Sequence, residues 1–207
     1  MRRIDMETFP RRSHFEFFKS YAYPYMGLSA NVDVTALIRK ARALGGSPFL
    51  ACLWAASTAA NAVPELRQRI DGDGIVEYDH CDVGHTVAQP DGTFVNCQTD
   101  CRRGLEEFLV YGKAQQEQAK KKHGFVQPGT DERNLIFVSC VPWVQFTSVL
   151  QPTPIPADCN PRIVFGKFFE EDGKTKMPLA IQCNHALVDG RHVGQFFEEF
   201  ARLAESQ

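Results

Sequence analysis

Near its C-terminus the chain reads Leu179-Ala180-Ile181-Gln182-Cys183-Asn184-His185-Ala186-Leu187-Val188-Asp189-Gly190. The apolar run up to Cys183 predicts a strand, and the spacing of apolar residues within Val188–Ala204 predicts a closing helix. His185 therefore lies at the end of a strand, where a rigid element can hold a side chain precisely at a cleft. Histidine titrates near neutral pH, so it can take a proton from a hydroxyl or thiol and return one.

The same residues have a plainer interpretation. A lone histidine at a strand end is more often an ordinary hydrogen-bonded residue, and Asp189-Gly190 is more often just a turn, which glycine permits. His192, seven residues beyond His185, falls on the predicted helix and is a weaker candidate. The local pattern alone leaves the catalytic and the structural interpretation of His185 open.

Further strands and helices alternate along the chain, with Asp33 as the N-cap of the first predicted helix. The predicted strands are Ile75–Tyr78, Asp82–Ala88, Thr93–Gln98, Asn134–Cys140, Val144–Val149, Arg162–Phe169 and Met177–Asn184, and the predicted helices are Val34–Leu44, Phe49–Val63, Arg103–Lys122 and one within Val188–Ala204. We therefore predict one α/β domain over 1–207, an α+β two-layer fold in which a mixed β-sheet carries helices mainly on one face.

Composition narrows the class of protein. The net charge of −2 and the absence of a basic patch predict no nucleic-acid partner. Seven cysteines without a CxxC pair or zinc-like spacing predict reduced thiols and no metal site. The N-terminus lacks the apolar stretch of a secretory signal, and no apolar run approaches the ~20 residues of a membrane span. These features predict a soluble, cytoplasmic protein with no membrane partner.

Four segments in order carry a resemblance. His185–Gly190 has the pattern HxxxDG, and Arg11–Phe18 is a basic segment followed by His and Phe. Phe137–Val144 contains Ser-x-x-Pro-Trp, and Pro64–Arg67 ends the second predicted helix before an acidic glycine turn. Together these segments resemble the chloramphenicol acetyltransferase family, in order and spacing along essentially the whole chain. The resemblance implies a coenzyme A-dependent acyltransferase-like fold.

The resemblance also implies roles for individual residues. His185 would be the general base that deprotonates the acceptor hydroxyl, whose oxygen then attacks the thioester of acetyl-CoA directly in a ternary complex. Ser139 would donate a hydrogen bond to the tetrahedral oxyanion. Asp189 would be a structural partner of Arg11, and this ion pair would hold the loop that carries His185. No metal is implied.

The acceptor pocket and the coenzyme A channel follow by position. An apolar, aromatic acceptor pocket would be lined by residues that could also be plain core: Phe17, Phe18, Phe94 and Phe125. Trp143 and Lys167 stand where the family's coenzyme A channel runs. The family is trimeric with sites between subunits, so the resemblance implies a homotrimer that binds coenzyme A and a small hydroxylated acceptor.

Three positions depart from the family pattern. Asn184 replaces the first His of the fuller HHxxxDG form, Phe18 stands where some members carry Tyr, and Val164 stands where some carry Thr. The main interpretation is acetylation of chloramphenicol, which confers antibiotic resistance. One alternative is the same reaction on another hydroxyl or thiol acceptor, and a second is a catalytically silent trimeric binding protein.

Overall fold

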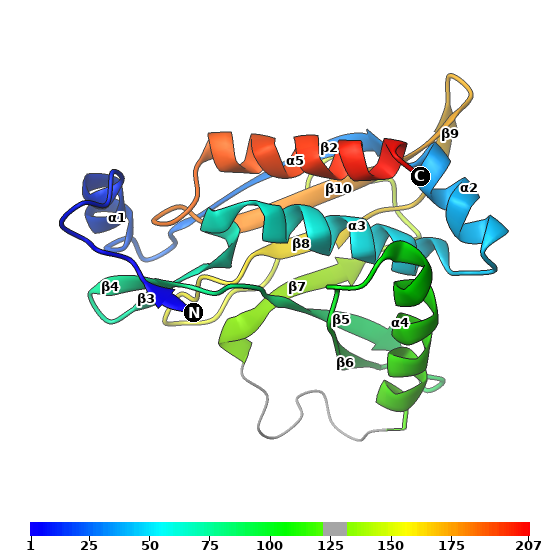
Figure 1. The fold of residues 1–207 in the computed structure, drawn as a ribbon, viewed down its shortest axis with the longest axis horizontal. Helices are drawn as coiled ribbons and strands as arrows, with labels where there is room; N and C mark the ends of the chain where they lie inside the picture. The colour runs from blue at the N-terminus through cyan, green and yellow to red at the C-terminus, as the bar shows by residue number, and fades with distance from the viewer. Residues whose placement is uncertain (122–131) are drawn as a thin grey trace.

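A computed structural model describes residues 1–121 and 132–207 of the chain. A seven-stranded mixed sheet forms the centre, and a three-stranded sheet adjoins it near the N-terminus (Figure 1). The helices are α1 Arg12–Phe18, α2 Thr35–Ala43, α3 Pro48–Ala62, α4 Leu105–Ala119 and α5 Gly190–Glu205, with 3-10 turns at η1 Pro64–Arg67 and η2 Glu132–Asn134. The strands are β1 Arg2–Arg3, β2 Tyr25–Asp33, β3 Gln68–Asp71, β4 Gly74–Glu77, β5 Asp82–Ala88, β6 Phe94–Thr99, β7 Leu135–Cys140, β8 Arg162–Phe165, β9 Phe169–Glu171 and β10 Lys174–Asn184.

Strand β10 organises the large sheet, whose order is β2-β10-β8-β7-β5-β6. It pairs antiparallel with β2, β8 and β9, whereas β7 runs parallel to both β5 and β8. The small sheet has the order β1-β4-β3. Because β8 and β10 are antiparallel, the end of β10 that carries His185 lies beside the beginning of β8.

The helices cover mainly one face of the large sheet, as predicted. Helices α3 and α5 lie side by side along it, and α4 lies beside β5 and β6 (Figure 1). Side chains alternate between the two faces of a strand, so Leu179, Ile181 and Cys183 of β10 enter the core on the helical side. Helix α3 is apolar on nearly all sides because it is packed between the sheet and its helical neighbours.

Strand β2 was absent from the sequence prediction. Its nine residues alternate weakly in polarity, since it is an edge strand with several exposed residues. It nevertheless pairs along its whole length with β10. Asp33 was predicted to cap a helix that starts at Val34; the helix starts at Thr35, whose backbone N–H donates to Asp33 Oδ1 at 2.9 Å. The N-cap is Val34, which makes no side-chain capping hydrogen bond, so the predicted N-cap was wrong, and Asp33 bonds the first helical residue from the position before the cap.

The predicted strand Val144–Val149 was wrong. The chain from Val141 to Pro161 contains neither strand nor helix, and its residues 147–151 line a cavity of about 320 Å³ together with parts of β2 and β10. The Gln151 backbone N–H donates to Gln182 Oε1 at 3.3 Å, so this loop contacts the face of β10 opposite the helices. The loop thus packs against β10 through side-chain contacts and does not pair with it as a strand.

No helix among the described residues is both long enough and apolar enough to cross a membrane.

Candidate active site

His185 lies in a tight turn that follows β10 directly. The Asn184 carbonyl accepts hydrogen bonds from the backbone N–H groups of Leu187 and Val188, at 3.1 and 3.0 Å. The His185 Nδ1 is 2.8 Å from the Val188 carbonyl oxygen. Because a carbonyl can only accept, we assign the imidazole proton to Nδ1, which leaves a lone pair on Nε2. The turn thus presents the tautomer that a general base needs.

Phe18 fixes the plane of the imidazole from the other side. Its ring stacks on the His185 ring with centroids 4.0 Å apart and an angle of 24° between the planes. Phe18 ends α1, and the backbone N–H of His185 donates to the Pro24 carbonyl at 2.7 Å on the segment that follows. Phe17 contacts Phe18 edge to face, and 58% of its surface is exposed. The N-terminal segment therefore forms one wall around the base.

The ion pair between Arg11 and Asp189 holds the turn in place. Arg11 Nε lies 3.2 Å from Asp189 Oδ2, and its guanidinium also donates to the Leu187 carbonyl. Burial alone raises the pKa of the Asp189 carboxyl, but the charges of His192 and Arg11 and the hydrogen bonds from the backbone of Arg191 and His192 together outweigh it, so the pKa lies below its usual range. Because 37% of the Asp189 side chain is exposed, this pair is only partly buried, and its rupture costs less than that of a fully buried pair.

His192 has a structural role that the sequence analysis did not predict. Asp189 is the N-cap of α5, and its Oδ1 accepts from Arg191 N at 3.0 Å. The His192 Nδ1 accepts from the Asp189 backbone N–H at 3.1 Å, which completes a capping box, and its Nε2 lies 3.6 Å from Glu65 Oε1. Burial lowers the pKa of His192. The Asp-x-x-His spacing could have indicated this capping box, because His takes the place that Glu or Gln usually fills.

Ser139 is far from His185 within one chain. In the sheet register Ser139 of β7 is level with Val164 of β8, which is level with Ala180 of β10. Ala180 precedes His185 by five positions along the strand. At about 3.3 Å per residue and about 4.8 Å per strand, the two Cα atoms are roughly 19 Å apart. No hydrogen-bonded relay between them fits within a single chain.

Three other predicted residues lie at the Ser139 end of the sheet. The Lys167 backbone N–H donates to the Val144 carbonyl at 2.9 Å, which brings Lys167 beside the segment that carries Trp143. Both side chains are exposed, Trp143 at 79%. Phe94 pairs with Ala88 at the end of β5, which runs parallel to β7, and it is 54% exposed. Phe125 lies outside the described residues.

The predicted residues therefore form two groups. The histidine half-site consists of Arg11, Phe17, Phe18, His185 and Asp189. The serine half-site lies at the other end of the sheet and consists of Phe94, Ser139, Trp143 and Lys167.

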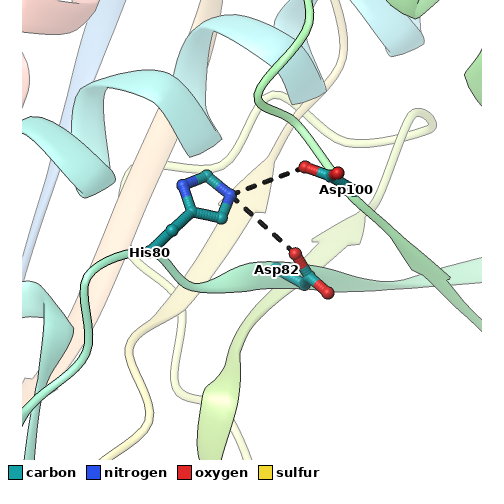
Figure 2. Close-up of side chains that lie close together, drawn as sticks. All are labelled: His80, Asp82 and Asp100. Atoms are coloured by element: carbon teal, nitrogen blue, oxygen red, sulfur yellow. Dashed lines mark ion pairs between the residues drawn. The ribbon is translucent and has the colours of Figure 1, made fainter. Parts of the chain in front are cut away.

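One further cluster of ionisable side chains lies three strands from β10, at His80, Asp82 and Asp100 (Figure 2). The His80 Nε2 is 3.8 Å from Oδ1 of each aspartate, too far for a hydrogen bond. Arg102 donates to both carboxylate oxygens of Asp100, at 3.0 and 2.9 Å, and Arg103 lies 3.3 Å from it. These cations already neutralise Asp100, so the cluster is better suited to an ion-pair network than to a metal ion.

Comparison with known proteins defines the class. The fold is that of the CoA-dependent acyltransferases: the truncated catalytic core of the 2-oxoacid dehydrogenase multienzyme complex from Thermoplasma acidophilum superposes with a TM-score of 0.69 at 16% identity, over 98% of each chain. A solved chloramphenicol acetyltransferase superposes with a TM-score of 0.85 at 26% identity, over 97% of each chain.

The sequence comparisons narrow the class to a family. The family model described as chloramphenicol acetyltransferase matches residues 1–201. A chloramphenicol acetyltransferase of Clostridium perfringens is 27% identical over 98% of this chain and 94% of its own. Chloramphenicol acetyltransferase 3 of Escherichia coli is 26% identical over 99% of this chain and 97% of its own. The chain belongs to the chloramphenicol acetyltransferase family.

Proposed function

We propose that this chain transfers the acetyl group of acetyl-CoA to a hydroxyl of chloramphenicol. Family membership supports the reaction class. The observation that carries the proposal is the hydrogen bond from His185 Nδ1 to the Val188 carbonyl, which leaves Nε2 free to take a proton. The free Nε2 lies at the end of a strand, held by Phe18 on one side and by the Arg11–Asp189 pair on the other.

In this reaction His185 Nε2 takes the proton of the acceptor hydroxyl. The acceptor oxygen attacks the thioester carbonyl, and the Ser139 hydroxyl donates to the oxyanion that forms. The carbon–sulfur bond then breaks, and the proton on Nε2 goes to the departing thiolate of coenzyme A, so that the base is regenerated. Every proton and electron pair in these steps comes from the acceptor, the thioester or His185, so the reaction balances without a metal or other co-reactant.

Cysteine chemistry supports direct transfer over a covalent acyl-enzyme. Cys140 follows Ser139, and Cys183 lies two residues before His185. Burial raises the pKa of the Cys140 thiol to about 11 and that of Cys183 to about 12. Both thiols stay protonated at neutral pH, and a protonated thiol is a poor nucleophile. Neither thiol therefore offers a thiolate that could form an acyl-enzyme, which supports direct transfer to the acceptor in a ternary complex.

We propose a closed homotrimer as the assembly for this mechanism. Ser139 and His185 of one chain are too far apart to act on one carbonyl group, so each site takes its histidine half-site from one chain and its serine half-site from the next. A ring of three copies closes such head-to-tail contacts without leaving a half-site unused. The exposed apolar side chains of Trp143 and Leu150, at 79% and 77%, are suited to such an interface.

A second candidate function is the same transfer to a different acceptor. Val164 lies between Ser139 and Ala180 in register and is 2% exposed, and it offers no hydroxyl at this position. Phe18 likewise presents a bare ring to His185. An acceptor pocket with fewer hydrogen-bonding groups favours an acceptor whose polar groups are fewer or differently placed.

The deciding experiment measures release of coenzyme A from acetyl-CoA by the purified protein with chloramphenicol, beside a His185→Ala variant. We expect turnover by the native chain and loss of it in the variant. Equal rates for the two proteins would overturn the proposal. Turnover with another hydroxylated compound, but not with chloramphenicol, would establish the second candidate instead.

A further inference from the structure

A buried amide side chain ends the last strand, directly before the base. Asn184 is 2% exposed, and both ends of its side chain are hydrogen-bonded. Its Oδ1 accepts from the Ala186 backbone N–H at 3.0 Å, and its Nδ2 donates to the Asp158 carbonyl at 2.9 Å. The side chain thus joins the turn around His185 to a separate segment of the chain.

That separate segment is firmly anchored. The Asp158 carboxylate receives two hydrogen bonds from Arg162, at 2.8 and 2.6 Å, in a bidentate pair. The Tyr25 hydroxyl donates to Asp158 Oδ1 at 3.0 Å and is 3.1 Å from its carbonyl oxygen. Burial raises the pKa of Tyr25, and the Asp158 charge raises it further, so the phenol remains a donor at neutral pH. Asp158 therefore ties the start of β2 and the start of β8 to Asn184.

The same amide residue also sets the position of the carbonyl that orients the base. The backbone carbonyl of Asn184 accepts from Val188 N, and the Val188 carbonyl accepts from His185 Nδ1. We propose that Asn184 is a positioning residue that holds the His185 imidazole in its Nδ1–H tautomer, with Asp158 as its anchor. This inference rests on the proposed function of His185 as the base, and it assigns a task to the residue that replaces the family's first His.

The physical reason is the hydrogen bond that the Asn184 side chain accepts within the turn. With the Asn184 side chain removed, the Ala186 N–H loses its acceptor inside the protein, and the turn relaxes to find another partner. Any such shift moves the Val188 carbonyl relative to Nδ1 and weakens the bond that sets the tautomer. A displacement of about 1 Å of a catalytic group can lower the rate by about 10²-fold.

The first test observes the imidazole itself. We would record ring nitrogen NMR spectra of histidine-labelled protein for the native chain, Asn184→Ala and the matched control Asn61→Ala. Asn61 is a partly buried amide that, like Asn184, is hydrogen-bonded at both ends, and its partners Ser57 and Cys81 lie outside the turn. We expect a single Nδ1–H tautomer of His185 in the native chain and in Asn61→Ala, and a mixture of tautomers in Asn184→Ala. An unchanged His185 signal in Asn184→Ala would overturn the proposal.

The second test uses kinetics with whichever acceptor the native chain acetylates. We expect kcat to fall by about 10-fold to 10²-fold in Asn184→Ala, while the KM for acetyl-CoA stays close to its native value. Asn184→Asp keeps the acceptor for Ala186 N but loses the donor to Asp158, and we expect it to recover part of the loss and most of the native tautomer. Equal losses in Asn61→Ala and Asn184→Ala would indicate a general stability effect and contradict the assignment.

The tautomer spectra need no substrate, so the two proposals fail separately. A native chain that acetylates no acceptor, yet shows the expected tautomer change in Asn184→Ala, would refute the proposed function alone.

Discussion

Ser139 and His185 lie at opposite ends of one sheet, two strands apart and displaced by five residues along the strand direction. This separation is a property of the strand register and does not depend on any side-chain conformation. An active site that uses both residues must be built from two chains, and each chain then contributes to two sites.

Mixed assemblies of two inactive variants should recover activity. His185→Ala and Ser139→Ala chains, unfolded together in equal amounts and refolded, place an intact histidine half-site beside an intact serine half-site in about a quarter of interfaces of a randomly mixed trimer. We expect a matching fraction of native turnover in the coenzyme A release assay. Refolding each variant alone is the control, and no gain on mixing would contradict shared sites.

Ser139→Ala should slow the chemical step more than it weakens binding. The hydroxyl is proposed to bond the oxyanion, which exists only during the reaction, so its loss lowers kcat by about 10²-fold to 10³-fold with little change in KM. Steady-state kinetics over a range of both substrates measure the two constants. A change confined to KM would instead place Ser139 in ground-state binding.

Asp189→Asn isolates the ion pair with Arg11, because Asn is as good an N-cap as Asp and can preserve the start of α5. The folded-state pKa of Asp189 is lowered, so its charge stabilises the fold above the ordinary carboxyl pKa of about 3.9, and this contribution is lost as the pH falls through the lower folded-state pKa. We expect the variant to have the lower Tm at pH 7. Thermal melts should show the gap between the two proteins closing toward pH 3, and a gap that widens in acid would be inconsistent with this sign.

Gly27→Ala should destabilise the pairing of β2 with β10. A Cβ at this position would lie 2.7 Å from the Ile181 carbonyl oxygen, so the two strands must move apart. We expect a loss of about 1–3 kcal/mol in the free energy of unfolding. Gly194→Ala, in α5 with nothing within 4 Å of its new Cβ, is the control and should stabilise the fold by up to about 1 kcal/mol. Denaturant titrations of both variants measure the difference.

The sequence pattern predicted the layered fold where periodicity was strong. The β10 strand, the closing helix and the packing of the helices on one face of a mixed sheet depend on buried apolar faces, whose spacing is visible in the sequence. Strand β2 left none, because an edge strand is stabilised by its backbone hydrogen bonds to β10 rather than by an alternating pattern. The apolar run Val144–Val149 resembled a strand, but in the structure it forms a loop that lies against β2 and β10 without joining the sheet.

The candidate site was predictable only in part. The motif located His185 and Asp189, since the turn and the capping residue are local in sequence. The network of Asn184 with Asp158, Tyr25 and Arg162 joins three distant segments and has no local signature. The distance between Ser139 and His185 likewise depends on register, which residue patterns do not report.

The division into two half-sites has a consequence for how such a protein changes under selection. Residues that set the proton transfer are gathered around the turn after β10 and on α1, while the serine half-site draws on β6, β7 and the loop that follows β7. Phe17 and Phe18 belong to the histidine half-site and were predicted to line the acceptor pocket, so random mutagenesis followed by selection for a new acceptor should recover substitutions there and in the serine half-site, and leave Arg11, His185 and Asp189 unchanged. Substrate range can then change through aromatic residues of both half-sites, while the residues that move the proton are retained.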